Sequence, residues 1–363
     1  MTPRQRLLAA LRGEPTDRVP VWLLFPYHPT GYYVDVRSHP AYRPVAEAAR
    51  QMAVTLNRRH FQAPMHTPEV VWRHEEAGGV QRSTLTCGGI RLLQEQAPGR
   101  VKKLLDTDED LEAWLHLPLN LDERAIREEL EAQLPRYEQE RREFPRDDGA
   151  MMLDLGEPIG PLYGSSNLES YAIWSLTHAE PVRSFLDRLM TQKRIVYRWC
   201  LERDLADVYF LVGSELASPP LVSRATFQQW IVPYARELIG LIHQHGKFAI
   251  QHYHGQIREI LDDFAVMGPD ALHTIEAPPI GNCTWAQAYA ARGDRITLIG
   301  NIQYDDFRAF TPAQMAAAVR QVLDECRGRR LILSPTAGPF DPDPPPRVIE
   351  NYLTFLRTAW EYA

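Results

Sequence analysis

Two histidines at the end of a short apolar segment are the residues of this sequence best placed for metal chemistry. The segment covers residues 247–255, and its composition and length favour a β-strand that leads into a helix. Side chains alternate between the two faces of a strand, so His252 and His254 point to the same side. That placement suits two ligands of one metal ion. The structural alternative is one core histidine bonded to a carbonyl, with the other filling space.

Acidic, amide and hydroxyl side chains follow the other apolar segments in the same way. They lie where each predicted strand ends: Glu157, Glu215, Glu276, Asn301 with Gln303, and Ser334 with Thr336. Imidazoles facing carboxylates favour a divalent metal, with zinc ahead of iron or cobalt. A catalytic zinc takes three protein ligands, and we expect His252 and His254 to be two of them.

More than one residue is a candidate for the third zinc ligand. Glu276 and Glu215 belong to the strands that flank the histidine strand in sequence, so they are the best candidates. Cys283, in the loop after Glu276, is an outside candidate. The alternative is a metal-free network of histidine and glutamate that only orients a substrate.

The elements that must position these residues alternate between strand and helix. The predicted strands are 151–157, 208–212, 248–252, 271–275, 295–299 and 330–333, and the helices between and after them are 181–201, 223–245, 256–267, 285–292, 311–327 and 346–362. Strands that are apolar on both faces predict a parallel sheet that is covered on both sides. With a first strand at 18–25 and another within 40–79, we predict a (β/α)8 TIM barrel. A doubly wound open sheet is the alternative.

Two segments stand outside this alternation. An N-terminal helix is expected at 4–11. Three short alternating runs separated by paired glycines, within 70–94, are typical of an antiparallel meander, and 107–140 is charged and helical. We therefore expect an insertion of about 68–145 within a single domain that spans 1–363.

The carboxyl ends of the strands suggest roles for the remaining residues. In barrels of this type these ends build the active site, so Glu157, Glu215 and Asn301 are our candidates for catalysis. Five side chains are candidates for holding a substrate: Tyr27, Tyr32, Tyr33, Gln303 and Thr336. The tyrosines either line an apolar pocket over the site or cap the barrel.

Charge and composition narrow the class of partner. The chain of 363 residues has a net charge of -7, which argues against a protein that grips nucleic acid or an anionic membrane. No apolar run reaches the ~20 residues of a membrane span, and no signal-peptide pattern is found, so we expect a cytoplasmic protein. The four cysteines form neither a metal motif nor a disulfide framework and are expected to be reduced.

Several stretches taken together resemble the uroporphyrinogen decarboxylase superfamily, which includes the zinc-dependent methylcobamide:thiol methyltransferases. They are residues 2–7 with 17–21, 221–234, 252–255, 299–302 and 334–338. The resemblance implies a barrel enzyme that forms a homodimer. In the methyltransferase branch it implies a zinc site made by a His-x-Cys-Gly motif and a later cysteine. Here His252 matches, but His254 and Ala337 occupy the two cysteine positions, so a carboxylate has to complete the site.

The leading functional hypothesis is methyl transfer. A corrinoid on a partner protein is the donor implied by the resemblance, and a small molecule activated by the metal is the acceptor. The metal is held by His252, His254 and a glutamate. No nucleic acid or membrane partner is expected.

Two other hypotheses remain open. One is a carboxy-lyase acting on a porphyrinogen or a smaller acid, with Glu215 and His252 placing a proton on the carbanion. The N-terminal arginine pair of the decarboxylase branch is missing and the expected mouth is acidic, which disfavours a polyanionic substrate unless Arg58 and Arg59 reach it. The other is a ligand-binding barrel that has lost catalysis, for which Ala337 is the only hint.

Overall fold

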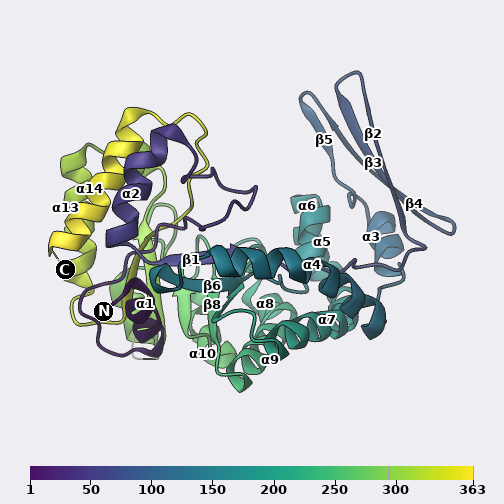
Figure 1. The fold of residues 1–363 in the computed structure, drawn as a ribbon. Helices are drawn as coiled ribbons and strands as arrows, with labels where there is room; N and C mark the ends of the chain where they lie inside the picture. The colour runs from purple at the N-terminus through teal and green to yellow at the C-terminus, as the bar shows by residue number, and fades with distance from the viewer. Residues whose placement is uncertain (293–294, 363) are drawn as a thin grey trace.

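Seven parallel strands form one curled sheet in the computed structural model, which describes residues 1–292 and 295–362 (Figure 1). In order of pairing they are β1 (Thr55–Arg59), β6 (Gly149–Leu153), β7 (Val208–Leu211), β8 (Phe248–His252), β9 (Ala271–His273), β10 (Thr297–Ile302) and β11 (Leu331–Pro335). The predicted parallel α/β sheet is confirmed. A doubly wound sheet reverses its strand order at a switch point, and this sheet follows chain order throughout, so that alternative is wrong.

Two residues near the N-terminus lie between the edges of this sheet. Val21 forms an isolated parallel bridge with Leu333 of β11, and Trp22 forms one with Val54, just before β1. The N–H of Trp22 donates to the Leu333 carbonyl at 2.9 Å, and the N–H of Val54 donates to the Val21 carbonyl at 2.8 Å. The predicted first strand is therefore much shorter than expected. Leu24 has a φ of 60°, in the left-handed region, so extended pairing ends before it.

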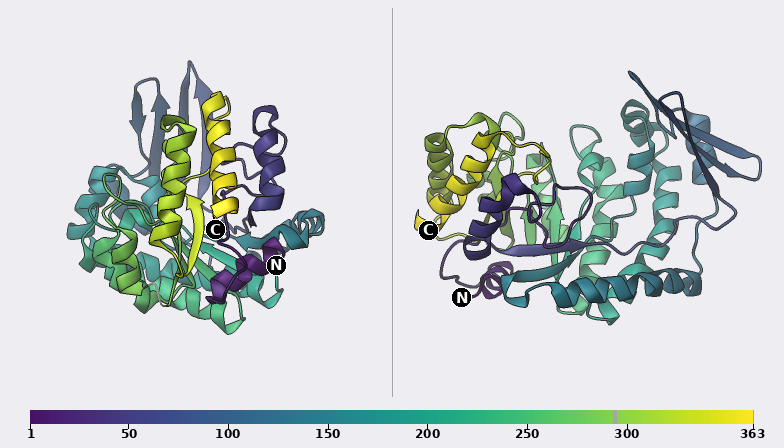
Figure 2. Two further views of the ribbon diagram at one scale, coloured as in Figure 1. Left: turned by 90° about the vertical axis from the view of Figure 1, so that its left-hand side faces the viewer. Right: turned by 45° about the horizontal axis from the view of Figure 1, so that its top comes forward.

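Helices surround the sheet, and α1 packs against its inner cluster. They are α1 (Pro3–Arg12), α2 (Arg43–Met52), α3 (Asp108–Leu115), α4 (Glu123–Glu143), α5 (Gly160–Ser165), α6 (Leu168–Thr177), α7 (Ala179–Glu202), α8 (Arg224–Trp230), α9 (Val232–Gln244), α10 (Leu261–Met267), α11 (Trp285–Arg292), α12 (Asp306–Ala309), α13 (Pro312–Glu325) and α14 (Pro346–Tyr362). Short 3-10 turns lie at η1 (Pro40–Tyr42), η2 (Arg146–Asp148), η3 (Glu215–Ala217) and η4 (Arg258–Ile260). Figure 2 shows α2, α13 and α14 side by side.

A second sheet of four strands projects away from the first. β2 (Val71–Ala77), β3 (Val80–Cys87), β4 (Ile90–Ala97) and β5 (Arg100–Lys102) pair antiparallel in chain order beside α3 (Figures 1 and 2). Strand β2 is exposed along its whole length, whereas Leu85 and Leu92 are buried. The sheet is thus anchored through the apolar side chains of its two inner strands.

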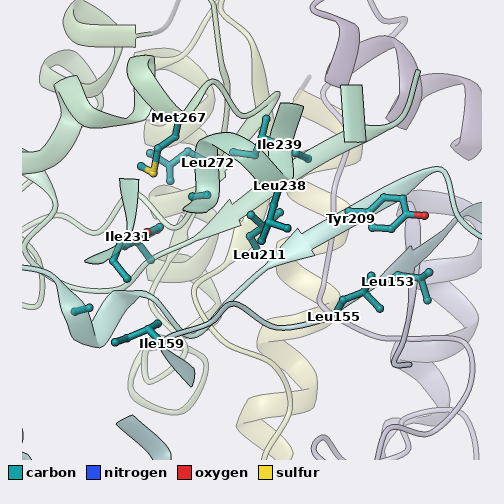
Figure 3. Packing of buried hydrophobic residues seen from close by; sticks show 14 of the residues in the cluster. Leu153, Leu155, Ile159, Tyr209, Leu211, Ile231, Leu238, Ile239, Met267 and Leu272 are labelled. Atoms are coloured by element: carbon teal, nitrogen blue, oxygen red, sulfur yellow. The ribbon is translucent and has the colours of Figure 1, made fainter. Parts of the chain in front are cut away.

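The apolar core lies on both faces of the parallel sheet. On the outer face, Tyr209 and Leu211 of β7 pack in one cluster with Leu238 of α9 (Figure 3). The inner cluster takes side chains from every strand of the sheet, together with Trp22 and α1: Leu7, Ala10, Leu11, Leu24, Val54, Leu56, Ala150, Met152, Val208, Phe210, Ile250, Ala271, Ile299 and Ile332. Successive residues of a strand pack in the outer and the inner cluster in turn, which explains why the strands are apolar on both faces.

Two expectations from composition can be compared with the structure. Within residues 1–292 and 295–362, no helix is both long enough and apolar enough to cross a lipid bilayer. The four cysteines are free thiols.

Candidate active site

His252 and His254 lie next to each other at the carboxyl end of β8. His252 is the last residue of the strand and is 9% exposed, and His254 follows it after one residue. Their ring centroids are 4.6 Å apart and the ring planes are nearly perpendicular, at 88°. Tyr253 between them is fully buried and packs against Phe227 and Phe264. The two imidazoles are thus neighbours, whereas the intervening ring packs against α8 and α10.

Glu276 holds His254 from the loop after the next strand. Its Oε1 lies 3.3 Å from Nδ1 of His254, and its Oε2 accepts the N–H of Gly255 at 2.6 Å. Burial acts to raise the pKa of Glu276, but the hydrogen bonds from His254, Gly255 and Gln303 lower it overall. Burial acts to lower the pKa of His254, and the hydrogen bond and charge of Glu276 raise it overall. Glu276 is therefore an ionised carboxylate that faces a histidine.

His252 is held by a histidine that sequence reasoning missed. Nδ1 of His252 lies 2.7 Å from Nδ1 of His273, which pairs directly with His252 in the register of β8 and β9. Nε2 of His273 lies 3.1 Å from the carbonyl oxygen of Pro335, on β11. Burial lowers the pKa of His252 well below its ordinary value and that of His273 to about 3. A histidine inside an otherwise apolar predicted strand was the signal that could have found it.

Two further carboxylates lie beyond the ends of β6 and β7. The hydroxyl of Ser214 donates a short hydrogen bond to Glu157, which is buried. Burial raises the pKa of Glu157 to about 8, outweighing the effect of Ser214. Glu215 accepts the N–H of Gly213 at 2.8 Å, and burial raises its pKa while the charge of His254 lowers it. Glu157 therefore carries a proton near neutral pH.

An arginine and an aspartate complete this end of the sheet. Nε of Arg58, on β1, lies 3.1 Å from Oδ2 of Asp154, which follows β6. The Arg58 guanidinium is 5.1 Å from the centre of the Phe210 ring, and that ring is 5.4 Å from the ring of His252. Sequence reasoning named Arg58 only as a distant possibility and did not single out Asp154. The ion pair leaves little free positive charge beside the histidines.

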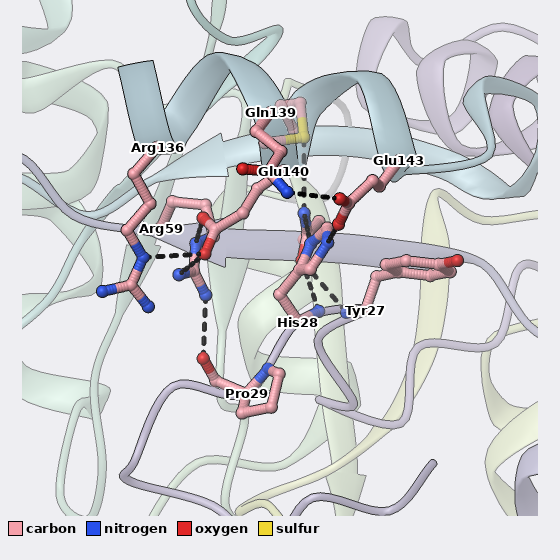
Figure 4. Close-up of polar contacts among 10 residues, drawn as sticks. Tyr27, His28, Pro29, Arg59, Arg136, Gln139, Glu140 and Glu143 are labelled. Carbon is pink, nitrogen blue, oxygen red and sulfur yellow. Dashed lines mark hydrogen bonds and ion pairs between the residues drawn. The ribbon is translucent and has the colours of Figure 1, made fainter. Parts of the chain in front are cut away.

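The neighbouring Arg59 is also paired. Its guanidinium donates to Glu140 of α4 at 2.8 Å and to the Pro29 carbonyl at 2.9 Å (Figure 4). The N–H groups of Tyr27 and His28 both donate to the Asn57 side chain at 3.0 Å, so the loop before Pro29 is bonded to β1.

The three tyrosines proposed to hold a substrate take different positions. Tyr27 packs against Phe144, and the guanidinium of Arg37 lies 4.0 Å from its ring centre. Tyr32 and Tyr33 contact each other, and Arg58 lies 5.9 Å from the ring centre of Tyr32. Burial raises the pKa of Tyr33 to about 12. Tyr32 and Tyr33 are thus connected to the site through Arg58, whereas the ring of Tyr27 contacts His28, Phe144 and Arg37.

The polar candidates on β10 and after β11 are bonded within the protein. The hydroxyl of Thr336 donates to Oε1 of Gln303 at 3.2 Å, and Gln303 is in turn a partner of Glu276. The Asn301 amide donates to the carbonyl of Ile275 at 2.6 Å. A chain of contacts therefore joins Thr336 to the histidines through Gln303 and Glu276.

No group of three or more histidine, cysteine, aspartate or glutamate residues suited to a metal ion occurs in the part of the chain that the structure describes. Of the predicted ligands, His252 and His254 are adjacent, while both oxygens of Glu276 accept hydrogen bonds from His254 and Gly255. Cys283 is fully buried, and burial raises its pKa to about 11. His252 and His254 would supply two of the three protein ligands that a catalytic zinc takes, and each is held through Nδ1, as metal-binding histidines usually are held through their other ring nitrogen.

The fold and the site belong to an α/β protein with paired imidazoles at the strand ends. A family model described as uroporphyrinogen decarboxylase (URO-D) matches residues 162–359, more than half of the chain, and the protein belongs to this family. Methylcobamide:CoM methyltransferase MtaA from Methanosarcina barkeri is 24% identical over 306 residues, which cover 83% of this chain and 82% of that protein. A methyltransferase from Methanosarcina mazei has a similar fold, with a TM-score of 0.61, 18% identity and 98% of each chain covered.

Proposed function

We propose that this protein transfers a methyl group from a corrinoid, carried by a partner protein, to a small acceptor molecule. The observation that carries the proposal is the pair of adjacent imidazoles, each oriented by a buried partner, at the strand ends of a chain similar to a methylcobamide:CoM methyltransferase. The similarity to that methyltransferase supports methyl transfer as the reaction class, and the paired imidazoles support activation of the acceptor by a metal.

A divalent metal, with zinc as first choice, would be held by His252 and His254. Such an ion lowers the pKa of a bound thiol or hydroxyl and so supplies a nucleophile near neutral pH. Glu276 orients His254 through its hydrogen bond. Glu215 is our candidate to accept the proton that the acceptor loses, because burial raises its pKa and the charge of His254 acts on it.

The experiment that tests this proposal combines metal analysis with a methyl-transfer assay. Protein purified without chelator is loaded with zinc, and methylcobalamin is supplied with a panel of small thiols and phenols. Loss of the methyl cation leaves cob(I)alamin, which absorption spectroscopy detects. Bound zinc together with transfer to at least one acceptor is the expected result. An empty site after loading, with no transfer to any acceptor, would contradict the proposal.

Decarboxylation of a small carboxylic acid is the second candidate function. The observation that favours it is Glu157, a buried carboxylic acid that holds a proton near neutral pH and can deliver it to a carbanion. A polyanionic porphyrinogen is disfavoured because Arg58 and Arg59 are each paired with a carboxylate. Release of CO2 from small aromatic or pyrrolic acids by metal-free protein would favour this candidate. Absence of both activities would leave the non-catalytic ligand-binding barrel.

Several structural expectations belong with this proposal. We propose that Val21 and Trp22 act as the eighth strand of a closed barrel, since they bridge both edges of the sheet and Trp22 packs in the inner cluster. The antiparallel sheet and its neighbouring helices, about 68–145, are proposed as an insertion into a single domain. A two-fold homodimer and a cytoplasmic location also stay predictions, and light scattering tests the first.

A further inference from the structure

We infer that His273 and Pro335 fix the tautomer of His252, so that Nε2 of His252 carries no proton and is free to bind a metal ion or accept a hydrogen bond. The inference makes His273 a positioning residue, because it acts through His252. The role of His252 as a metal ligand rests on the proposed function. The tautomer itself does not.

The first step concerns the Pro335 carbonyl. A carbonyl oxygen only accepts hydrogen bonds, and Nε2 of His273 lies 3.1 Å from it. Nε2 of His273 therefore carries the proton. This holds whether the His273 ring is neutral or charged.

The second step concerns the contact between the two imidazoles. Nδ1 of His252 and Nδ1 of His273 are 2.7 Å apart, so one nitrogen donates and the other accepts. His273 has no exposed surface, and its ring nitrogens contact an imidazole and a carbonyl rather than a carboxylate. A charged ring there would be desolvated without a counter-ion in contact, which strongly favours the neutral form. A neutral His273 with its proton on Nε2 accepts at Nδ1, so Nδ1 of His252 is the donor.

The third step follows for His252. A neutral imidazole has one N–H and one bare nitrogen, so a proton on Nδ1 leaves a lone pair on Nε2. The aromatic neighbours hold both rings in place. Phe210 lies 5.4 Å from the His252 ring, and Trp22 lies 5.4 Å from the His273 ring, measured between centroids.

The identity of the orienting partner also bears on the charge of the site. His254 is oriented by an ionised carboxylate, whereas His252 is oriented by a neutral ring. The site already holds Glu157, Glu215 and Glu276, which act on one another or on the histidines electrostatically. An imidazole partner therefore orients His252 without adding another negative charge.

Two substitutions of His273 separate its hydrogen bond from its bulk. His273→Leu fills a similar volume but offers no acceptor, whereas His273→Asn keeps an acceptor oxygen close to the position of Nδ1. The proteins are labelled with 15N-histidine and studied without metal, and NMR reports which ring nitrogen of His252 carries the proton. The signal of His252 is assigned by its loss in a His252→Gln variant. Zinc affinity is then measured by competition with a chelator.

The expected result in the unmodified protein and in His273→Asn is a proton on Nδ1 of His252. In His273→Leu we expect the proton to move at least partly to Nε2, and zinc affinity to fall by about 10- to 100-fold, the usual effect of losing an outer-shell partner. His273→Asn should bind zinc within a few-fold of the unmodified protein.

The outcomes distinguish this inference from the proposed function. A proton on Nε2 of His252 in the unmodified protein would overturn the inference, as would an unchanged tautomer in a folded His273→Leu variant. A proton on Nδ1 in a protein that binds no zinc would support the inference and contradict the proposed metal site. If His273→Leu does not fold, the spectra of the unmodified protein and of His273→Asn still decide the question.

Discussion

Glu276 accepts hydrogen bonds from the side chain of His254 and the backbone of Gly255, with one carboxylate oxygen for each. This contact couples the end of β8 to the loop that follows β9. It also means that Glu276 acts on the proposed metal through His254. The sequence analysis had expected Glu276 itself as a ligand.

Replacing Glu276 by Gln should therefore weaken zinc binding without abolishing it. The amide keeps the shape of the side chain but removes the negative charge that faces His254, and losses of this kind are about 10- to 100-fold in affinity. Chelator competition measures the effect, and Glu259→Gln, on the exposed surface, is the matched control. Complete loss of zinc would instead indicate that Glu276 is a direct ligand.

The neighbouring residues His252 and Tyr253 should respond differently to truncation. His252→Ala should remove bound metal and methyl transfer, because it deletes a proposed ligand. Tyr253→Ala should mainly destabilise the fold, by roughly 3–5 kcal/mol, since it empties a fully buried ring position. Elemental analysis and urea unfolding measure the two effects. Full metal occupancy in a double variant that lacks both His252 and His254 would refute the assignment.

The buried carboxyl of Glu157 should make stability fall as pH rises. Its pKa in the folded protein is about 8, against an ordinary 4.5, so between these values the folded state holds the extra proton. The resulting slope is at most about 1.4 kcal/mol per pH unit. Glu157→Gln should remove this slope. The free energy of unfolding of the variant, minus that of the unmodified protein, should therefore be larger at pH ~8 than at pH ~5. Urea unfolding across this range provides the test, and identical slopes would contradict it.

His66 should produce the opposite trend on the acid side. It is 9% exposed, neither ring nitrogen has a hydrogen-bond partner among the described residues, and burial lowers its pKa from 6.5 to about 4. The unfolded chain takes up the proton first, so stability is lost as pH falls from about 6.5 to about 4. The His66→Leu variant lacks this pH-dependent loss. Its stability relative to that of the unmodified protein should therefore rise as pH falls over the same interval. Thermal melts at several pH values measure the difference.

Removing one partner of the Arg58–Asp154 ion pair should lower the free energy of unfolding more than removing both. Both side chains are largely buried, so Asp154→Asn leaves an uncompensated guanidinium and should cost about 3–5 kcal/mol. The double variant Arg58→Met with Asp154→Asn should lose less, because no buried charge remains unpaired. Denaturant unfolding of the two single variants and the double variant gives the coupling energy. Simple additivity would show that the ion pair contributes little.

Local sequence patterns determined much of the fold. Apolar runs bounded by turn residues identified the strands from β6 to β11. The helix predicted at 311–327 is α13, and it begins at a capping box formed by Thr311 and Gln314. The alternation of side chains predicted that His252 and His254 share a side, and their rings are adjacent although β8 ends at His252. These features depend on residues close in sequence, which is why periodicity and capping rules can predict them.

The tertiary structure alone decided which distant residues meet. Strand β1 is short and carries Asn57, Arg58 and Arg59, so it has no apolar pattern, and its place is decided by pairing with β6. The contact of His252 with His273 depends on the register of β8 against β9, which brings the two residues opposite each other. Periodicity specifies the face on which a side chain lies but not the partner strand or its register. Only packing of the whole sheet settles those, and with them the hydrogen bonds that orient the two imidazoles.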